Sequence, residues 1–307
     1  MPKLGLSIKY WIVISIAIAI TSCASLFTSA SNPDQIRLGT FNLENFDGTN
    51  TQKLEAVSQI IERNFDAIGL QEISSLGAEK LKEQLNKSKQ WEFVLGDTGS
   101  RQRMALFYRK DLISAQKVTE WQKVNITGTL RSPLVTFVKA GANFDFTLVI
   151  VHQKGGGGDE ADRLRKNQSD RLRQEVDSYQ KNPQSDPDLI LVGDFNSPTW
   201  ADQNRGLRDA PLTFLTRDIE TGKKENCLKK RGQPKTPDGR PRYTNRGTGC
   251  VIDHIVISKA PKGAEEEYIS QSLQILDPQK DLGFDSDRTY FDKVSDHLPV
   301  RAIFRSK

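Results

Sequence analysis

Short apolar runs and amphipathic stretches follow one another along most of the chain. Residues 36–43 alternate apolar and polar positions like a half-buried strand, and residues 52–64 carry apolar side chains at helical spacing. A second helix is predicted over about 76–88, and a polar helix over about 160–180. Further strands are predicted at about 66–70, 91–95, 104–109, 115–122, 134–138, 144–152, 189–193, 251–257 and 299–305. Helices that alternate irregularly with many strands predict an α/β fold, most simply a sheet sandwich covered by helices.

One long stretch, residues 206–249, lacks apolar periodicity and is rich in Gly, Pro, Lys and Arg. We expect it to be an insertion of surface loops. Residues 217–247 hold ten Lys or Arg against four acids, a net charge of +6. This segment is therefore more positive than the whole chain, whose net charge is +5. Residues 163–173 add five basic residues and one acid. Such segments, with Tyr243 nearby, suit contact with a phosphate backbone, although most charged runs are simply solvated surface.

The first 22 residues have the features of an export signal rather than of the fold. Lys3 and Lys9 precede an apolar run at 11–20, and small residues lead to Cys23. The string I-T-S-C resembles the bacterial lipobox, which predicts cleavage before Cys23 and lipidation of its thiol; the alternative is an ordinary signal cut a few residues later. Residues 23–35 would then be a tether. The prediction is an exported lipoprotein of the bacterial cell envelope, or a secreted protein.

The composition excludes several classes of protein. Three cysteines and three histidines are too few for a disulfide-rich scaffold or a Cys/His zinc module. The apolar runs are too short and too few for a multi-span membrane protein. If the chain is exported, the two remaining cysteines, Cys227 and Cys250, are expected to form a disulfide, the alternative being two buried thiols.

Polar groups stand at the ends of six apolar strands, where a rigid scaffold commonly presents catalytic residues. They are Asn42, Glu72, His152, Asp194, Asn196, Asp253, Asp296 and His297. Carboxylates and amides are hard ligands that suit Mg²⁺ or Mn²⁺, with Ca²⁺ also acceptable, and histidines can act as acid and base near neutral pH. Neither a G-x-S-x-G motif nor a glycine-rich phosphate loop is present. This set favours attack of water on a metal-held phosphate ester.

Six strings make the chain resemble the endonuclease/exonuclease/phosphatase superfamily, most closely its deoxyribonuclease I-like members. They are TFNLENF at 40–46, LQEI at 70–73, IVHQKG at 150–155, GDFNSP at 193–198, IDHIVIS at 252–258 and SDHLPV at 295–300. They occur in the family's order within residues 36–307. The resemblance implies a four-layer α/β sandwich with the active site at one end of two packed sheets.

The resemblance also implies a ligand set for the metal. Glu72 would be the main ligand, with help from Asn42 and Asp296. One-metal and two-metal mechanisms are both assigned within the family, and the choice stays open here. His254, which follows Asp253 inside a strand, is expected to be structural.

The catalytic roles follow from the same resemblance. Asp253 would orient His297, which would draw a proton from the attacking water. His152 would lie near the phosphate and protonate or steady the leaving oxygen. Asp194 and Asn196 would bind a second metal or position phosphate and water. The division between acid and base stays open, since either histidine could mainly stabilise charge.

The chain departs from deoxyribonuclease I at several places. Gln102 stands where that enzyme has a glutamate paired with the histidine matched by His152, and a neutral amide supports a histidinium less well. Arg103 and Arg165 remain as expected substrate contacts, together with Tyr243. We predict a monomeric exported nuclease without a protein partner. The alternative is a phosphoesterase on lipid head groups or small phosphate esters, which the polar, basic insertion disfavours. A non-catalytic binding module would not need the complete set of polar residues.

Overall fold

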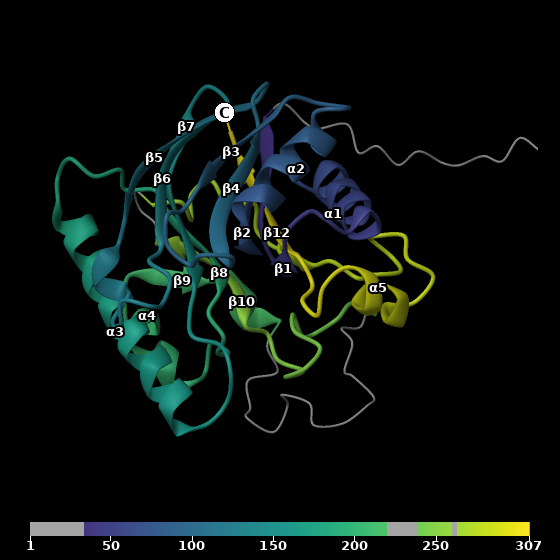
Figure 1. The fold of residues 1–307 in the computed structure, drawn as a ribbon. Coiled ribbons are helices and arrows are strands. Elements are labelled where there is room, and N and C mark those ends of the chain that lie inside the picture. Colours follow the sequence, from purple (N-terminus) through teal and green to yellow (C-terminus); the bar gives the residue numbers. More distant parts are fainter. Residues whose placement is uncertain (1–33, 220–238, 260–262, 307) are drawn as a thin grey trace, which may run out of the picture. The chain divides into compact units, whose positions relative to one another are not determined.

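A computed structural model describes residues 34–219, 239–259 and 263–306 of the 307-residue chain. Two six-stranded mixed sheets organise this part (Figure 1). The first sheet has the strand order β11-β12-β1-β2-β4-β3. Its strands are β1 (Gln35–Phe46), β2 (Ala67–Ile73), β3 (Trp91–Leu95), β4 (Arg103–Arg109), β11 (Gln274–Ile275) and β12 (Val300–Arg305).

The second sheet has the order β5-β6-β7-β8-β10-β9. Its strands are β5 (Ile113–Glu120), β6 (Leu134–Ala140), β7 (Phe144–His152), β8 (Leu189–Asp194), β9 (Leu212–Phe214) and β10 (Asp253–Ser258). The first sheet contains one parallel pair, β1 with β2, and the second contains one parallel pair, β7 with β8. The strands on either side of each pair are antiparallel to it.

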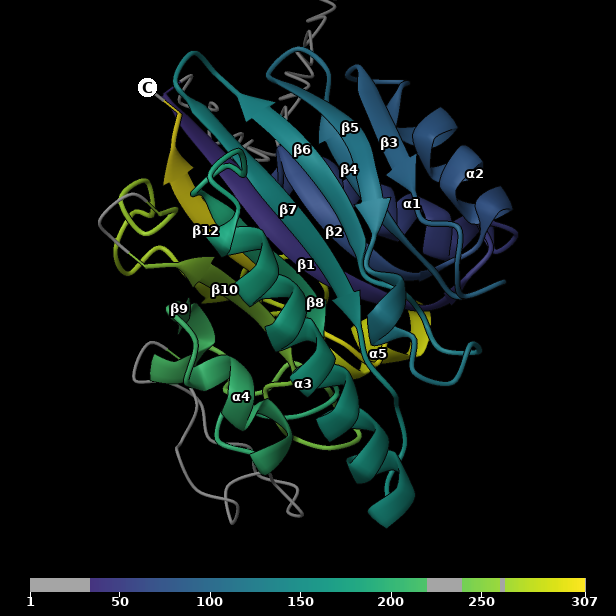
Figure 2. The ribbon, with the colours of Figure 1, turned by 90° about the vertical axis from the view of Figure 1, so that its left-hand side faces the viewer.

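Helices cover the outer faces of both sheets (Figure 2). Apolar side chains of α1 (Thr51–Asn64) and α2 (Ser75–Leu85) join the same core cluster as the first sheet. The long helix α3 (Asp159–Lys181) packs Leu172 and Val176 against the second sheet, with α4 (Arg205–Arg208) beside it. Helix α5 (Asp287–Lys293) precedes β12. The short 3₁₀ turns are η1 (Gln122–Val124), η2 (Asp202–Asn204) and η3 (Leu215–Asp218).

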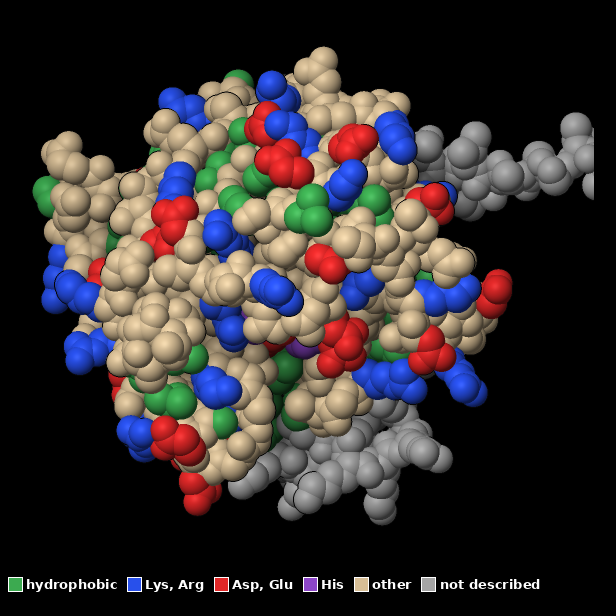
Figure 3. Space-filling model, in the orientation of Figure 1, with side chains coloured by type: hydrophobic (Ala, Val, Ile, Leu, Met, Phe, Trp, Pro, Cys, Tyr) green, Lys and Arg blue, Asp and Glu red, His purple; other side chains and the backbone are tan. Residues whose placement is uncertain are grey.

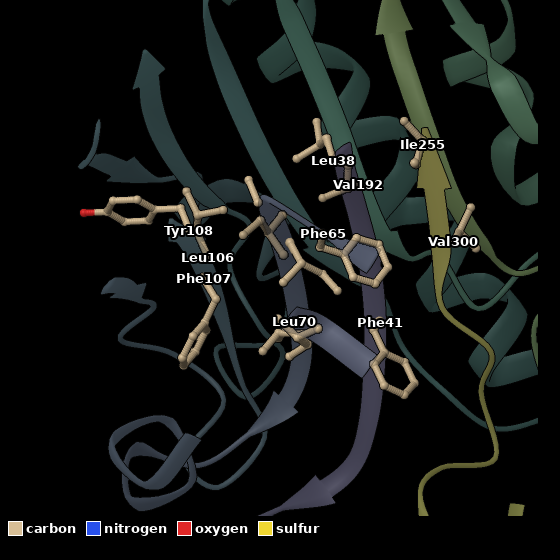
Figure 4. Packing of buried hydrophobic residues seen from close by; sticks show 14 of the residues in the cluster. Leu38, Phe41, Phe65, Leu70, Leu106, Phe107, Tyr108, Val192, Ile255 and Val300 are labelled. Carbon is tan, nitrogen blue, oxygen red and sulfur yellow. The ribbon is translucent and has the colours of Figure 1, made fainter. Parts of the chain in front are cut away.

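The alternation of side chains along the strands explains why two sheets and two helical layers form. Along β8, Ile190 and Val192 belong to the core that contains the first sheet, whereas Leu189 and Leu191 belong to the cluster under α3. Successive residues of a strand point to opposite faces, so a strand that is apolar at every position must be covered on both sides. Figure 4 shows Val192 and Ile255 of the second sheet among residues of the first, such as Leu38 and Val300.

Two glycines allow close approaches that position the ends of the strands. A Cβ atom on Gly69 of β2 would lie 2.7 Å from the side chain of Val192, so the missing side chain lets the two sheets approach each other there. A Cβ atom on Gly193 of β8 would lie only 2.0 Å from the carbonyl oxygen of Val151 in the parallel strand β7. Gly193 also has a φ of 147°, a value that other residues rarely adopt. The absence of a side chain at Gly193 therefore allows the close pairing in which the ends of β7 and β8 lie side by side.

The predicted four-layer sandwich is confirmed, and most predicted elements lie within a few residues of the observed ones. The prediction of surface loops over residues 206–249 is wrong for its first part. That part contains α4, β9 and η3, and β9 pairs with β10 while Leu212 and Phe214 are buried. Residues 220–238, which include Cys227, lie outside the described residues, so the pairing of Cys227 with buried Cys250 stays a prediction.

At the N-terminus, the signal, Cys23 and most of the tether also lie outside the described residues. Gln35, the last residue of the predicted tether, is already part of β1. None of the described helices combines the length and the apolar character that crossing a membrane requires.

Candidate active site

The polar strand ends converge at one end of the two packed sheets. In the second sheet, the register places His152 of β7 and Asp253 of β10 on either side of Asp194 in β8. In the first sheet, Asn42 of β1 pairs with Gln71, next to Glu72 at the end of β2. The side-chain amide of Asn42 joins the two sheets, because it donates to Asp194 Oδ2 at 3.0 Å. Figure 3 shows a histidine in a hollow near the centre of this face, with acidic side chains beside it.

His297 and Asp253 form a buried pair at the centre of the site. Nδ1 of His297 lies 2.8 Å from Asp253 Oδ2, and Nε2 faces Asp194 Oδ2 and Asp296 Oδ1, each at 3.8 Å. Burial by itself would lower the pKa of His297, but the three carboxylates outweigh it and raise the pKa to about 10. In the chain without a cation, His297 is therefore protonated at neutral pH.

The backbone around His297 is tied to both neighbouring elements. The Ser295 hydroxyl donates to the Asn42 carbonyl at 2.7 Å and accepts from the backbone N–H of His297 at 3.1 Å. The Tyr290 hydroxyl of α5 donates to the His297 carbonyl at 2.6 Å. These bonds hold the segment before β12 against β1, so His297 is fixed in the site before any substrate arrives.

Asp194 is a buried carboxylate with too little positive charge around it. One oxygen accepts from the backbone N–H of Asn196 at 2.7 Å, and the other accepts from Asn42. Burial and the nearby Asp253 nevertheless raise its pKa to about 7, against the opposing effect of His297. Its ionised form is thus under-stabilised in the chain alone, and a cation at this place would correct the imbalance.

His152 is held as a neutral imidazole next to the two carboxylates. Its Nε2 lies 3.7 Å from Glu72 Oε1 and 3.8 Å from Asp194 Oδ2, while its buried Nδ1 has no hydrogen-bond partner within the described residues. Burial, reinforced by the charges of Arg131 and His297, holds its pKa well below the usual value. The two site histidines are therefore in opposite protonation states near pH 7.

The structure places Arg131 in the site, although sequence analysis did not single it out. Its guanidinium donates to the carbonyl of Gln153 at 3.1 Å, to that of His152 at 3.4 Å and to Gln102 Oε1 at 3.3 Å. It is the only charged residue between positions 125 and 138, and this isolation is the signal that could have revealed it. Arg131 brings positive charge close to Glu72 and Asp194.

Glu72 lies opposite the histidines, and Gln102 supports it rather than His152. Glu72 Oε2 accepts from the backbone N–H of Asn45 at 3.0 Å and from Gln102 Nε2 at 3.1 Å. Gln102, which stands at the position of a family glutamate, bonds Glu72 and Arg131 here, so its amide links the carboxylate to the guanidinium. Glu72 Oε1 is left to face Asn42 and His152.

The residues present fit a divalent cation, with one correction to the predicted ligands. The Oδ1 atom of Asn42 accepts from the Glu44 backbone, and its Nδ2 faces the carboxylates of Glu72 and Asp194 at 3.4 and 3.0 Å. Asn42 thus positions these carboxylates, and ligation through Oδ1 would require the amide to turn over. Asp296, whose side chain is 44% exposed, stands at the rim.

Two donor sets are available to such a cation. Asp194, Asp253 and His297 can bring three ligand atoms within 4.8 Å of one another, and the buried Asp253 Oδ1 finds no hydrogen-bond partner in the part of the chain that the structure describes. Nδ1 of His297 is already hydrogen-bonded to Asp253 Oδ2, however, so these two side chains are engaged with each other. Glu72 and Asp194 therefore make the better primary ligands, and the excess of buried negative charge is the observation that fits Mg²⁺ or Mn²⁺.

Several site residues have a strained backbone. Six described residues other than glycine have a positive φ, and four of them surround the site. They are Glu44, Asn45, Glu72 and Asn196, with φ between 49° and 58°. This conformation costs about 1–2 kcal/mol for a residue such as glutamate and clusters at functional sites. Glu72 and Asn196 are thus aimed into the site by turns that ordinary strand ends do not make.

The remaining predicted residues lie at the edge of the site or away from it. Tyr243 is only 5% exposed and packs on Phe291, so its assignment as a substrate contact is wrong: it belongs to the core. The Arg103 guanidinium donates to the carbonyls of Ser100 and Gly96, and Arg165 donates to those of Lys154 and Gly156. Both arginines therefore hold loops beside the catalytic cluster.

His254 has the structural role that the sequence predicted. Its ring packs edge-to-face against Phe195 and Phe214, with centroid distances of 5.4 Å to each. Its Nε2 donates to the Ser197 carbonyl at 2.9 Å, so its Nδ1 accepts from the Thr216 hydroxyl at 2.6 Å. Burial lowers its pKa to about 4, which keeps it neutral.

Comparison with known proteins points in the same direction as the geometry. The model of the Endonuclease/Exonuclease/phosphatase family matches residues 39–297, which include every residue of the cluster described above. No curated protein matches the chain.

Solved structures share the fold at low sequence identity. A Bacteroides thetaiotaomicron protein described as an endonuclease/exonuclease/phosphatase family protein superposes with a TM-score of 0.60 at 17% identity, covering 89% of this chain and 98% of its own. The human Nocturnin catalytic domain with bound sulfate has a TM-score of 0.58 at 16% identity, covering 88% and 93%. TDP2 of D. rerio, complexed with a single-strand DNA product, has a TM-score of 0.58 at 16% identity, covering 88% and 99%.

Proposed function

Because the chain belongs to the Endonuclease/Exonuclease/phosphatase family and is thus a hydrolase of ester bonds, we propose that it is a metal-dependent nuclease. Its reaction would be the hydrolysis of phosphodiester bonds in nucleic acid by attack of water. One observation carries the proposal: Asp194 lies within 4 Å of both His152 and His297, Glu72 lies within 4 Å of His152, and His297 is paired with buried Asp253. This arrangement combines hard metal ligands with two histidines in opposite protonation states.

The surface supports nucleic acid over a lipid substrate. Among the described residues, only Leu76 and Val118 are large apolar side chains that are strongly exposed, at 52% and 56%. They lie on different elements, α2 and β5, and so do not form a membrane-inserting hairpin. The printed descriptions of structural neighbours point the same way, since D. rerio TDP2 is complexed with a single-strand DNA product.

The metal would be held by Glu72 and Asp194, with Asp296 at the rim. When bound, a divalent cation supplies charge stabilisation at the phosphate and makes a bound water more acidic. The identity of the ion, Mg²⁺ or Mn²⁺ with Ca²⁺ as a further candidate, belongs to the proposal. Asn42 and Gln102 would keep both carboxylates oriented through their amide groups.

His297 would act on the attacking side, oriented by Asp253. Its raised pKa of about 10 means that it carries a proton in the chain alone, where it can stabilise negative charge on a phosphate. Asp194 is among the groups that raise this pKa, so positive charge placed on Asp194 would lower it. Action of His297 as a base is therefore coupled to occupation of the metal site.

His152 would act at the phosphate itself. It is neutral and lies against Glu72 and Asp194, and Arg131 supplies the fixed positive charge next to it. A neutral imidazole can donate one hydrogen bond to a phosphate oxygen without repelling the cation. Asn196, whose backbone N–H bonds Asp194, would position phosphate or water through its side-chain amide.

One assay separates the nuclease from its alternative, a phosphoesterase on lipid head groups or small phosphate esters. The protein is incubated with plasmid DNA, RNA, sphingomyelin vesicles and a simple phosphodiester, each with Mg²⁺, Mn²⁺ or EDTA. We expect metal-dependent cleavage of nucleic acid that Glu72→Gln and His297→Ala each reduce at least about a hundredfold. Glu83→Gln, at an exposed carboxylate of α2, is the matched control. Lipid hydrolysis without cleavage of nucleic acid would overturn the proposal.

We also propose that the protein is exported and anchored to a bacterial membrane by a lipid on Cys23, with a disulfide between Cys227 and Cys250. The charged start, the short apolar run and the I-T-S-C string support this proposal. Cys23→Ser should release the protein from the membrane fraction, and the wild type should incorporate labelled fatty acid. A wild type found only in the soluble fraction would refute the anchor.

A further inference from the structure

A pocket of about 530 Å³ adjoins the catalytic cluster on the side of Asn196. It lies between the first turns of α3 and the loop that follows β8, and this volume is within the range of about 300–1,000 Å³ that holds small ligands. Its lining includes Trp200, Arg165, Asp162, Asp202, Gln203 and Pro198. Asn196 both lines the pocket and binds the Asp194 carboxylate through its backbone, so a group in the pocket would be close to the reacting phosphate.

The charges around the pocket disfavour a second phosphate. The Asp162 carboxylate is hydrogen-bonded to the Arg165 guanidinium, so the positive charge of Arg165 is already balanced. The first turn of α3 carries three acids, Asp159, Glu160 and Asp162, which offset the attraction of a helix N-terminus for anions. Asp202 adds a further negative charge to the lining. The pocket therefore suits a neutral group.

The polar and aromatic groups indicate what that neutral group is. Trp200 is only partly buried, so its indole can be covered by a flat ring. Arg165 is 5% exposed, yet its Nε has no hydrogen-bond partner within the described residues. A buried N–H without a partner is costly and would bind an acceptor oxygen or nitrogen. The lining thus combines a flat apolar ring with a hydrogen-bond donor.

We propose that this pocket is a nucleobase subsite, in which the base of a nucleotide adjoining the scissile phosphate stacks on Trp200 and accepts a hydrogen bond from Arg165 Nε. This inference rests on the proposed nuclease function and names its substrate class more narrowly. A base inside a duplex is stacked on its neighbours and cannot enter a pocket without leaving the helix. Unpaired strands are therefore the expected substrates, since stacking on an aromatic side chain is available to every base.

The test compares two polymers that differ only in their bases. One is a single-stranded DNA oligonucleotide; the other has the same length, with tetrahydrofuran residues in place of the nucleosides, so that its phosphates remain. The wild type should show a kcat/KM roughly 5- to 150-fold higher on the DNA, which is the contribution expected from stacking of one base. Trp200→Ala should remove this stacking contribution and leave only the smaller preference that the Arg165 hydrogen bond supplies, and Trp200→Phe should keep most of the ratio.

Two further variants keep the test decisive. Leu76→Ala, which removes an exposed apolar side chain on α2, should leave the ratio unchanged. Trp200→Leu replaces the ring by an apolar side chain and serves if Trp200→Ala fails to fold by circular dichroism. Equal cleavage of both polymers by the wild type, or an unchanged ratio in folded Trp200→Ala or Trp200→Leu, overturns the subsite alone. A wild type that cleaves no nucleic acid with any metal overturns the nuclease function, and the subsite with it.

Discussion

Replacement of Asp253 by Asn tests the electrostatic reasoning about the site directly. Asp253 Oδ2 lies 2.8 Å from His297 Nδ1, and both side chains are buried. The asparagine keeps the size and one oxygen of the side chain but removes its charge. Since burial alone lowers the pKa of His297, loss of this carboxylate should bring the pKa down from about 10 toward its ordinary value of 6.5 or below.

The size of the effect follows from the same pKa. A rise from 6.5 to about 10 corresponds to roughly 5 kcal/mol of preference for the charged imidazole. Asp253, Asp194 and Asp296 share this preference, so Asp253 accounts for part of it. Asp253 also raises the pKa of Asp194, and Asp253→Asn should therefore lower that pKa too. For turnover, loss of the carboxylate that orients a catalytic histidine costs about 10⁴-fold in serine proteases, and we expect about 10²- to 10⁴-fold here.

Histidine NMR is a clean assay, because the chain has only three histidines. In the metal-free wild type, none should titrate between about pH 6 and 8: His297 stays protonated, while His152 and His254 stay neutral. In Asp253→Asn one resonance should begin to titrate near or below pH 6.5, while His254, with its pKa of about 4, serves as the internal reference. A wild-type His297 that titrates near 6.5, or one that Asp253→Asn does not move, would refute the reasoning.

Three further predictions concern metal binding, charge and the core. Burial raises the pKa of Asp194 to about 7, so ionisation of Asp194 destabilises the folded state as pH rises from about 4 to 7. The gain in Tm on adding Mg²⁺ or Mn²⁺ should therefore be larger at pH 8, where Asp194 is ionised, than at pH 5. An equal gain at both pH values would contradict a role for Asp194 as ligand. Arg131→Met should raise the pKa of His152 in the same NMR titration and lower kcat about 10- to 100-fold. An unchanged His152 pKa would show that the charge of Arg131 does not act on this histidine. His254→Ala should lower the free energy of unfolding, measured by urea titration, by about 2–4 kcal/mol, because it removes two hydrogen bonds and the ring packed on Phe195. The metal affinity, measured by calorimetry, should stay unchanged. A loss of metal affinity as well would show that His254 acts on the site.

The sequence predicts the fold well because its signals are local. The strands at 91–95 and 144–152 are apolar or alternating runs bounded by turns, and the structure places β3 and β7 at these residues. Short elements without such a signal were missed. The three-residue strand β9 forms because it pairs with the edge of β10, a contact that nothing within residues 206–218 reveals.

The candidate site could be predicted as a set of residues but not as a set of contacts. Strand-end position identifies His152, Asp194 and His297, since the register of the sheets brings such ends together. The direction of the Asn42 amide depends on the Glu44 backbone and on two carboxylates from other strands, so no local pattern encodes it. The burial of Tyr243 depends in the same way on packing against α5.

The conformation of Glu72 explains why this site needs the whole sandwich around it. A glutamate at φ 58° is unfavourable by about 1–2 kcal/mol, and a free strand end would relax to an extended conformation. The Glu72 carboxylate accepts hydrogen bonds from Asn45, itself at φ 55°, and from Gln102 at the start of β4. The hydrogen bond from the Asn45 N–H to the Glu72 carboxylate thus joins two strained residues on neighbouring strands. The same bonds leave Oε1 directed at His152 and the second sheet, where a cation would offset its charge. The strained turns of the first sheet and the excess negative charge of the second therefore lie at one place, and that place is where the reaction is proposed to occur.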